Sequence, residues 1–311
     1  MTPLGAAVIV ALSARFQGQE PVPPMGRMPI PRPLKARLLP VWNTGHRLAW
    51  RLGEYVGAVV HRRFERCAVC GRFGPMLYRR GVIPPKLEAM WGLSPRVAEA
   101  LARKESLECW SCGAKLRARR LARVMLDLYP VGDPPSPARS VRAWATTPAA
   151  RALRVAEINR IDGLHGELLR LPFLAWSDFT EGEPGPDAPR SEDLTRLSYP
   201  DESFDLVLTS ETLEHVPDLD AALGQILRVL RPGGRHIFTV PLLPGVVRTH
   251  RRTDRLCHPG GDAGYPVITE FGADLPVILE AAGYETDLRF GPITEDDVAQ
   301  VWVARKPKVR S

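Results

Sequence analysis

The chain has 311 residues, of which 44% are hydrophobic and 25% are charged. These values exclude a disordered or fibrous protein, and the length exceeds that of one average domain, so we expect two folded units. Residues 1–130 contain 22 Lys and Arg against 8 Asp and Glu, whereas residues 131–311 contain 20 against 27. A polyanionic partner would therefore meet the first part of the chain, unless the excess arginine only forms a solvated surface.

Residues 1–35 are expected to be a flexible N-terminal segment. Six prolines between positions 17 and 35 disfavour a core element there. The apolar run "PLGAAVIVALSAR" is shorter than the roughly 20 residues that span a bilayer, and no basic residue precedes it as in a secretory signal. We therefore expect no export signal and a cytoplasmic protein.

Residues 36–66 are predicted to form a basic amphipathic helix. Trp50, Leu52, Val56 and Val59 recur at roughly helical spacing among Arg and His residues. Packing of this helix against the protein's own domains is the favoured interpretation, and peripheral contact with an anionic membrane surface is the alternative.

Four of the five cysteines form two identical Cys-x-x-Cys-Gly motifs, which we call the first and the second cysteine turn. Gly71 and Gly113, which follow the pairs, let each turn close so that backbone N–H groups face the sulfur atoms. Two such turns supply the four thiolates of a closed, structural zinc site. The matched pair of turns disfavours a redox motif, and the missing export signal disfavours disulfides. The predicted zinc ligands are Cys67, Cys70, Cys109 and Cys112, and Cys257 is expected to be a lone thiol.

The predicted zinc-binding region covers residues 67–128. The 38 residues between the two cysteine turns contain a helical pattern, so we expect a small, mainly helical domain. The segment "KLRARRLARVMLDLY" follows the second turn and is predicted to be an arginine-rich helix, which is typical either of nucleic-acid contact or of plain packing. Its arginines are Arg117, Arg119, Arg120 and Arg123.

Residues 129–150 are expected to be a linker, because "YPVGDPPSPARSV" is rich in Pro and Gly. From there, residues 151–311 alternate between strand and helix patterns. "LRVAEI", "FLAWSD", "SFDLVLTS" and "RHIFTVPL" are typical of strands, and "DGLHGELLRL" and "DLDAALGQILRVL" of helices. The alternation predicts a doubly wound α/β sheet, in which ligands bind at the carboxyl ends of the strands.

The block "SYPDESFDLVLTSETLEHVPDLDAALGQILRVLRPGGRHIFTVP" resembles the centre of class I S-adenosylmethionine-dependent methyltransferases of the type 11 group. The acidic turn, the "FDLV" strand, the "LEHV" segment and the "LRPGG" turn occur together and in order. The resemblance implies a Rossmann-like, seven-stranded sheet that binds S-adenosylmethionine. It also implies SN2 methyl transfer, which needs positioning and exclusion of water more than a catalytic triad.

The same resemblance implies a cofactor loop of the form acid-x-Gly-x-Gly-x-Gly after the first strand. Laying "EINRIDG" on this pattern aligns Glu157 with the acid and Gly163 with the last glycine, while Asn159 and Ile161 stand where two glycines belong. Asn tolerates the left-handed conformation, so Asn159 replaces a glycine at modest cost. Ile161 does not, so either the loop takes another path or Ile161 has ordinary dihedrals and narrows the pocket.

Four further positions are implied to touch the cofactor. Asp178 would accept hydrogen bonds from the ribose hydroxyls, and Asp193 from the adenine amino group, with the Leu194 backbone beside it. Ser210, which ends the "SFDLVLTS" strand, completes the set, while Glu157 would face the methionine amino group. Surface acids at strand ends are the plain alternative for both aspartates.

Glu211, Glu214 and His215 follow this strand at spacings that share one face of a helix. In ubiquinone-biosynthesis O-methyltransferases, which this segment resembles, such a cluster has been linked to a divalent cation. Alternatively, His215 acts as a base that takes a proton from an acceptor hydroxyl, or the acids simply favour the helix dipole.

The core motifs do not identify the methyl acceptor, and three hypotheses remain. In the first, the zinc region and residues 258–272 cover the site and select a small molecule or a saccharide, with His250, His258 and Tyr265 as candidate lining residues. In the second, the zinc region and its arginines hold RNA. In the third, Ile161 closes the pocket and the protein is a non-catalytic scaffold. Nothing in the sequence indicates an oligomeric state.

Overall fold

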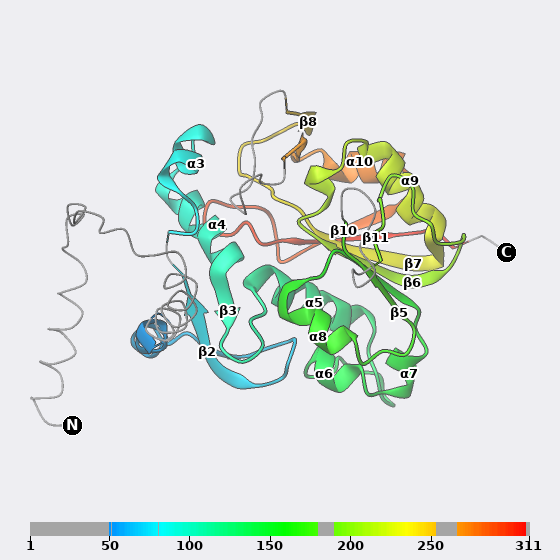
Figure 1. Ribbon diagram of the computed structural model, residues 1–311, viewed down its shortest axis with the longest axis horizontal. Coiled ribbons are helices and arrows are strands. Elements are labelled where there is room, and N and C mark those ends of the chain that lie inside the picture. Colours follow the sequence, from blue (N-terminus) through cyan, green and yellow to red (C-terminus); the bar gives the residue numbers. More distant parts are fainter. Residues whose placement is uncertain (1–49, 51, 80, 180–189, 253–265, 309–311) are drawn as a thin grey trace, which may run out of the picture. The chain divides into compact units, whose positions relative to one another are not determined.

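The computed structural model describes residues 50, 52–79, 81–179, 190–252 and 266–308 (Figure 1). The chain divides into two units, residues 1–51 and 52–311, and almost all of the described residues belong to the second. The predicted N-terminal segment lies outside the described residues, and so does the predicted basic helix before residue 52, except for residue 50. Cys257, His258 and Tyr265 lie outside them too. Among the described residues, no helix has the length and apolar character needed to cross a membrane.

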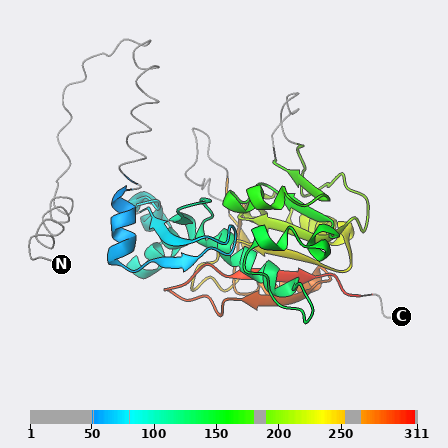
Figure 2. The same ribbon diagram turned by 90° about the horizontal axis from the view of Figure 1, so that it is seen from below.

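A helix at residues 52–60 leads into a small antiparallel sheet of order β1–β2–β3 (Figure 2). Its strands are β1 (Phe64–Arg66), β2 (Phe73–Tyr78) and β3 (Leu107–Cys109). The Glu54 carboxylate accepts a hydrogen bond from the backbone N–H of Tyr78, which fastens the helix to β2. The predicted apolar stripe of this helix faces outward, since Leu52, Val56 and Val59 are each more than half exposed.

Helices α3 (Pro85–Met90) and α4 (Pro95–Ser106) lie between β2 and β3, and α5 (Leu116–Leu128) follows the second cysteine turn. The start of α4 is set by Ser94, whose hydroxyl accepts a hydrogen bond from the N–H of Val97, and by the proline at its first position. A mainly helical domain was predicted here. The structure has these helices and, in addition, a three-stranded sheet.

The second half of the stretch 129–150, predicted to be a linker, is instead folded and partly buried, whereas residues 132–137 are exposed. It contains α6 (Val141–Trp144) and α7 (Pro148–Arg151), which are capped by the hydroxyls of Ser140 and Thr147. The side chain of Trp144 is fully buried, and its Nε1 donates a hydrogen bond to the carbonyl of Tyr129 at 3.0 Å. The Pro and Gly content of its first half concealed the apolar positions of its second half.

The main sheet has six strands in the order β10–β11–β7–β6–β4–β5. The central pairs β4–β5, β4–β6 and β6–β7 are parallel, whereas β11 runs antiparallel to both β7 and β10. The strands are β4 (Val155–Ile158), β5 (Leu174–Ser177), β6 (Phe204–Ser210), β7 (Leu230–Thr239), β10 (Glu285–Arg289) and β11 (Val301–Arg305). Seven strands were predicted, so the described residues lack one. Between β5 and β6, residues 190–203 form turns held by buried Glu192, which accepts a hydrogen bond from the N–H of Ser198.

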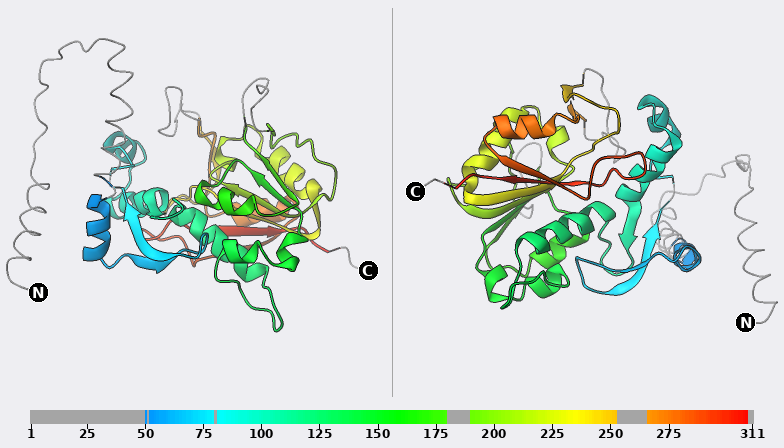
Figure 3. Two further views of the ribbon diagram at one scale, coloured as in Figure 1. Left: turned by 60° about the horizontal axis from the view of Figure 1, so that its bottom comes forward. Right: turned by 180° about the vertical axis from the view of Figure 1, so that it is seen from behind.

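Helices cover both faces of this sheet, which confirms the predicted doubly wound α/β architecture (Figures 1 and 3). One face carries α5 and α8 (Asp162–Leu168), and the other carries α9 (Leu219–Val229) and α10 (Leu275–Ala281). Inward residues alternate along the strands as a period of two requires: Leu206 and Leu208 of β6 face one layer, and Val207 faces the other.

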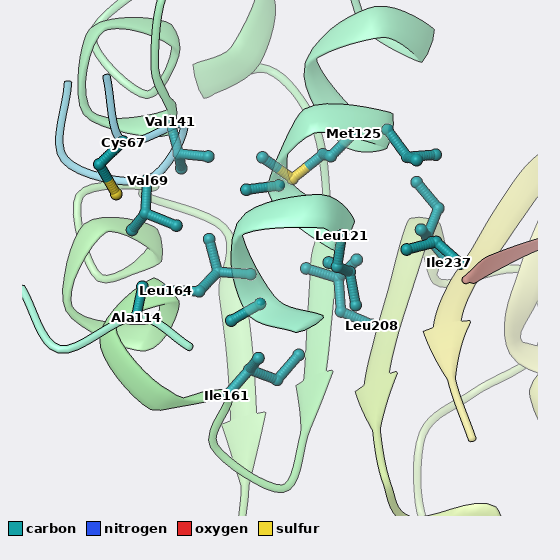
Figure 4. Packing of buried hydrophobic residues seen from close by; sticks show 14 of the residues in the cluster. Cys67, Val69, Ala114, Leu121, Met125, Val141, Ile161, Leu164, Leu208 and Ile237 are labelled. Carbon is teal, nitrogen blue, oxygen red and sulfur yellow. The ribbon is translucent and has the colours of Figure 1, made fainter. Parts of the chain in front are cut away.

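One hydrophobic core joins the cysteine turns to the first of these faces. Leu121 and Met125 of α5 pack in the same cluster as Leu208 of β6, and Cys67 and Val69 of the first cysteine turn belong to it too (Figure 4). Helix α5 thus begins directly after the second cysteine turn and covers one face of the main sheet. Residues 67–128 share their core with the sheet rather than burying a core of their own.

We predict that Trp144→Ala lowers the free energy of unfolding by about 3–5 kcal/mol, because it empties a fully buried site and removes a hydrogen bond. Urea denaturation measures this loss. Phe173→Ala, at a half-exposed position, is the control and should cost about 0.5 kcal/mol or less. Equal small losses for both variants would show that residues 129–150 do not contribute to the common core.

Candidate active site

The four cysteines predicted as ligands come together between the two cysteine turns. The Sγ atoms of Cys67 and Cys112 are 3.7 Å apart, those of Cys70 and Cys109 are 3.8 Å apart, and all four lie within 4.8 Å of one another. Tetrahedral zinc with bonds of about 2.3 Å places its sulfur ligands about 3.8 Å apart. The four thiols therefore fit one ion of this kind with no position left open.

The two cysteine turns repeat the same local structure. In each, the glycine N–H donates to the carbonyl of the first cysteine at 2.9 Å, and Gly71 and Gly113 have positive φ values of 79° and 71°. The N–H of Ser111 points at Cys109 Sγ from 3.4 Å. These features agree with the predicted role of the two glycines.

The loop that the resemblance assigns to cofactor binding begins at Glu157, at the end of β4. Its carboxylate is fully buried, accepts a hydrogen bond from the N–H of Ile161 at 3.0 Å, and lies 2.5 Å from His165 Nδ1. Burial raises the pKa of Glu157, while His165 and the Ile161 N–H oppose that rise. Glu157 therefore ties the loop to α8.

Asn159 and Ile161 resolve the question of the two missing glycines. Asn159 has a φ of 62°, and its Oδ1 accepts a hydrogen bond from the N–H of Phe179, so it occupies the left-handed conformation as predicted. Ile161 has an ordinary φ of −101° and is 1% exposed. Its side chain points into the core near Leu164 (Figure 4), so Ile161 fills the layer beneath the loop.

Gly163, aligned with the last glycine of the loop, lies against the second cysteine turn. A Cβ atom built there would stand 2.2 Å from the carbonyl oxygen of Cys112 and 2.8 Å from the N atom of Ala114. Its φ is not in the left-handed region, so the close approach alone requires glycine. No pattern in the residues around Gly163 indicated this contact.

Asp178 and Asp193 lie where the resemblance predicted, after β5 and before β6. Both oxygens of Asp178 are engaged by Arg160, through its backbone N–H at 3.0 Å and its Nε at 2.6 Å. Asp193 is exposed, and its Oδ1 accepts hydrogen bonds from the N–H and hydroxyl of Thr195. The neighbouring Leu194 is buried.

At the end of β6, Ser210 contacts β7, and Glu211 pairs with a lysine from the cysteine-containing region. Ser210 Oγ lies 2.8 Å from the hydroxyl of Thr239 on β7. Glu211 adopts a positive φ of 51°, and its Oε2 accepts a hydrogen bond from Lys104 Nζ at 2.7 Å. Lys104 belongs to α4, and its side chain is 1% exposed. Although burial opposes it, Lys104 lowers the pKa of Glu211.

His215 ends a single 3-10 turn, η1 (Leu213–His215). Its Nδ1 lies 2.8 Å from the carbonyl oxygen of Pro266, so Nδ1 carries the ring proton and Nε2 is the basic atom. Burial lowers the pKa of His215, although Pro266 and Glu211 oppose this. The ring is therefore neutral at pH 7.

The predicted divalent-cation cluster of Glu211, Glu214 and His215 is wrong. The three residues do not share one helical face, because Glu211 precedes η1 in a left-handed conformation and pairs with Lys104. Among the described residues, the cysteines are the one group of potential ligands close enough to hold an ion. Burial, with Glu211 nearby, raises the pKa of Glu214 well above its usual value.

A pocket of about 540 Å³ lies between α4, α5 and the carboxyl ends of β6 and β7. One part of its wall is apolar and aromatic, and the other carries charged groups together with His215. The predicted lining residue His250 is not part of it: His250 lies half-exposed on β8 (His250–Arg251), which pairs with β9 (Thr269–Glu270). The residues around the pocket are Arg79, Val82, Ile83, Trp91, Leu101, Glu105, Ser106, Glu108, Lys115, Arg117, Glu211, His215 and Pro241.

Residues 178–238 match a family model described as a methyltransferase domain. The chain is 54% identical over 112 residues to the 27-O-demethylrifamycin SV methyltransferase of Amycolatopsis mediterranei, covering 35% of this chain and 37% of that protein. It is 46% identical over 43 residues to the methyltransferase GfsG of Streptomyces halstedii, covering 14% and 16%. The chain thus spans less than two fifths of the length of these relatives.

Among solved structures, the chain is similar to the 1,6-didemethyltoxoflavin-N1-methyltransferase of Burkholderia thailandensis, with a TM-score of 0.36 and 20% identity. That similarity covers 50% of this chain and 71% of the other. The residues that match the family model run from the end of β5 to β7 and include Asp193, Glu211 and His215. Residues 178–238 thus match a methyltransferase domain, and the similar proteins named above are methyltransferases.

Proposed function

We propose that the chain transfers the methyl group of S-adenosylmethionine to a hydroxyl oxygen of a small-molecule acceptor bound in the pocket between α4, α5 and the sheet. The observation that carries this proposal is the position of His215. A neutral imidazole with its proton fixed on Nδ1 lines a pocket at the carboxyl end of β6, where ligands of such sheets bind. A hydroxyl acceptor must lose its proton during transfer, and this base is placed to take it.

The cofactor would be held along the carboxyl ends of β4, β5 and β6. Asp193 and the backbone of Leu194 would bind the adenine, and Asp178 the ribose, once Arg160 gives up part of its bond to that carboxylate. The loop from Glu157 to Gly163 and the end of β6 at Ser210 would complete the site. The cofactor supplies an electrophilic methyl group on a sulfonium sulfur, which leaves as the thioether.

The protein's own contribution is then to position the acceptor and to move one proton. His215 Nε2 takes the hydroxyl proton as the oxygen–carbon bond forms, and the Pro266 carbonyl stabilises the imidazolium through the Nδ1 hydrogen bond. Helices α4 and α5 line the pocket, and an acceptor bound against them would displace water from it.

The pocket walls favour an uncharged acceptor with an apolar side. Val82, Ile83, Trp91, Leu101 and Pro241 form an apolar surface, which suits a ring system. The opposite wall has its charges paired within the protein, as in Glu105 with Arg117 and Glu211 with Lys104. A wall that offers both hydrogen-bond donors and acceptors suits hydroxyl groups, because a hydroxyl both donates and accepts hydrogen bonds. The name of the Amycolatopsis relative, which acts on a demethylrifamycin, supports an acceptor of this class.

The RNA hypothesis loses the residues on which it depended. All four arginines of α5 make bonds within the protein. Arg119 is 4% exposed and donates to the carbonyl of Leu107, while Arg120 forms a two-pronged ion pair with Asp297. Arg117 pairs with Asp162, and Arg123 with Asp127. The scaffold hypothesis is weakened too, because Ile161 packs into the core instead of closing the pocket.

We also propose that the four cysteines hold one structural zinc ion. Purified protein should contain about one zinc per chain, and Cys70→Ser should lose it on dialysis against EDTA, because an alcohol oxygen does not replace a thiolate ligand. Cys257→Ser is the control and should keep the metal. Elemental analysis by mass spectrometry measures both, and a metal-free native protein of full stability would contradict the assignment.

Binding of the cofactor is tested by calorimetric titration with S-adenosylhomocysteine. We expect micromolar affinity for the wild type and a loss of at least about tenfold for Asp193→Ala, because one carboxylate bond to adenine is removed. Asp287→Ala, at an exposed position on the far edge strand β10, is the control. The proposed function fails if the wild type shows no binding at millimolar ligand.

The role of His215 predicts a pH profile. The neutral ring is the active form and its pKa lies below the usual value, so kcat should rise as pH increases through that lowered pKa and stay level above about pH 7. His215→Asn should lower kcat about 10²–10⁴-fold without changing S-adenosylhomocysteine affinity. The assay uses an acceptor found by screening hydroxylated ring compounds. An unchanged kcat in His215→Asn, with His250→Asn as the neutral control, would rule out the base.

A further inference from the structure

The backbone of the second cysteine turn rests directly on the first turn of α8. No side chain fits between them, because a Cβ at Gly163 would lie 2.2 Å from the Cys112 carbonyl oxygen. Gly166, one turn further along the same helix, has no atom within 4 Å of its own Cβ position. Helix α8 therefore requires glycine at position 163, against the cysteine turn, but not at position 166.

Ion pairs reinforce this contact from both sides. Asp162 begins α8 with a positive φ of 33°, a conformation that non-glycine residues rarely adopt. Its two carboxylate oxygens face Lys115 Nζ at 3.6 Å and Arg117 Nη2 at 3.1 Å. Both cations directly follow the second cysteine turn, so the turn and its basic residues hold Asp162 in this conformation.

The residues held in this way continue the loop proposed to bind the cofactor. Asn159 lies three residues before Asp162, and Glu157 bonds forward to Ile161 and His165. A shift of the second cysteine turn would move the start of α8 and with it this loop. In the family pattern, glycines allow the cofactor loop to take its path. In this chain, the contact between α8 and the second cysteine turn holds the loop instead.

We infer that the second cysteine turn is the positioning element of the cofactor loop, so that metal binding at the cysteines and cofactor binding are thermodynamically coupled. The inference rests on the proposed function. Coupling between two ligands is reciprocal, so metal must strengthen cofactor binding by the same factor as cofactor strengthens metal binding. The metal site then acts in the reaction through the loop, without touching either substrate.

The first test compares Gly163→Ala with the matched control Gly166→Ala. Metal release to the chromogenic chelator 4-(2-pyridylazo)resorcinol should be at least about tenfold faster in Gly163→Ala, as for other changes to residues that support metal ligands. Affinity for S-adenosylhomocysteine should fall in the same variant, and Gly166→Ala should match the wild type in both. A wild-type release rate in Gly163→Ala would overturn the inference.

A second pair of variants introduces no clash and serves if Gly163→Ala does not fold. Arg117→Met removes the bonds to Asp162 and Glu105, and Arg123→Met alters an arginine of the same helix that pairs with its neighbour Asp127. Arg117→Met should speed metal release and weaken S-adenosylhomocysteine binding, whereas Arg123→Met should change neither. Equal behaviour of the two variants would contradict the inference.

The unaltered protein gives an independent measurement. Saturating S-adenosylhomocysteine should raise the equilibrium affinity for zinc, measured by competition with 4-(2-pyridylazo)resorcinol, at least about fivefold, the lower range of typical coupling between sites. Binding of S-adenosylhomocysteine with an unchanged zinc affinity would overturn the coupling and leave the proposed function standing. Absence of any S-adenosylhomocysteine binding would overturn the proposed function and the coupling together.

Discussion

The contact between Gly163 and the backbone of the second cysteine turn is the constraint on which the site depends. It fixes the start of α8 against the metal ligands, and the Asp162 ion pairs with Lys115 and Arg117 hold it from the side. Because α5 leaves that turn and packs on the sheet through Leu121 and Met125, one cluster of buried side chains connects the cysteines to the sheet (Figure 4). If the proposed function holds, the cysteine-containing region before the sheet is therefore part of the architecture of the active site.

Ion pairs also connect the basic first part of the chain to the acidic second part. The basic excess of the first 130 residues suggested a polyanionic partner, yet several of these cations pair with acids of the second part of the chain. Arg120 with Asp297 and Arg96 with Asp296 join sequence positions far apart, and Lys104 does the same with Glu211 at the edge of the pocket. The Lys104–Glu211 pair is buried, and such a pair fixes geometry more than it adds stability, whereas the Arg96–Asp296 pair is exposed. Part of the charge asymmetry therefore describes how two parts of one unit fit together.

The sequence predicted well those features that depend on local pattern. The alternating strands and helices of the sheet, the four cysteine ligands with their glycines, and the left-handed Asn159 all follow from spacing or from residue chemistry. It failed where distant segments meet. Neither the pairing of Glu211 with Lys104 nor the close approach at Gly163 has a signal within its own stretch of chain, and the predicted cation site and linker were wrong for that reason. A proline-rich start likewise hid the buried Trp144.

The most direct test of this account is the crystal structure of the full chain with zinc and S-adenosylhomocysteine. We predict that the adenine lies at Asp193 and Leu194, that the sulfur faces the pocket beside Glu211 and His215, and that Gly163 remains against the second cysteine turn. A ligand bound elsewhere, or a cofactor loop that is ordered without contact to that turn, would contradict the claim that the cysteine-containing region completes the methyltransferase site.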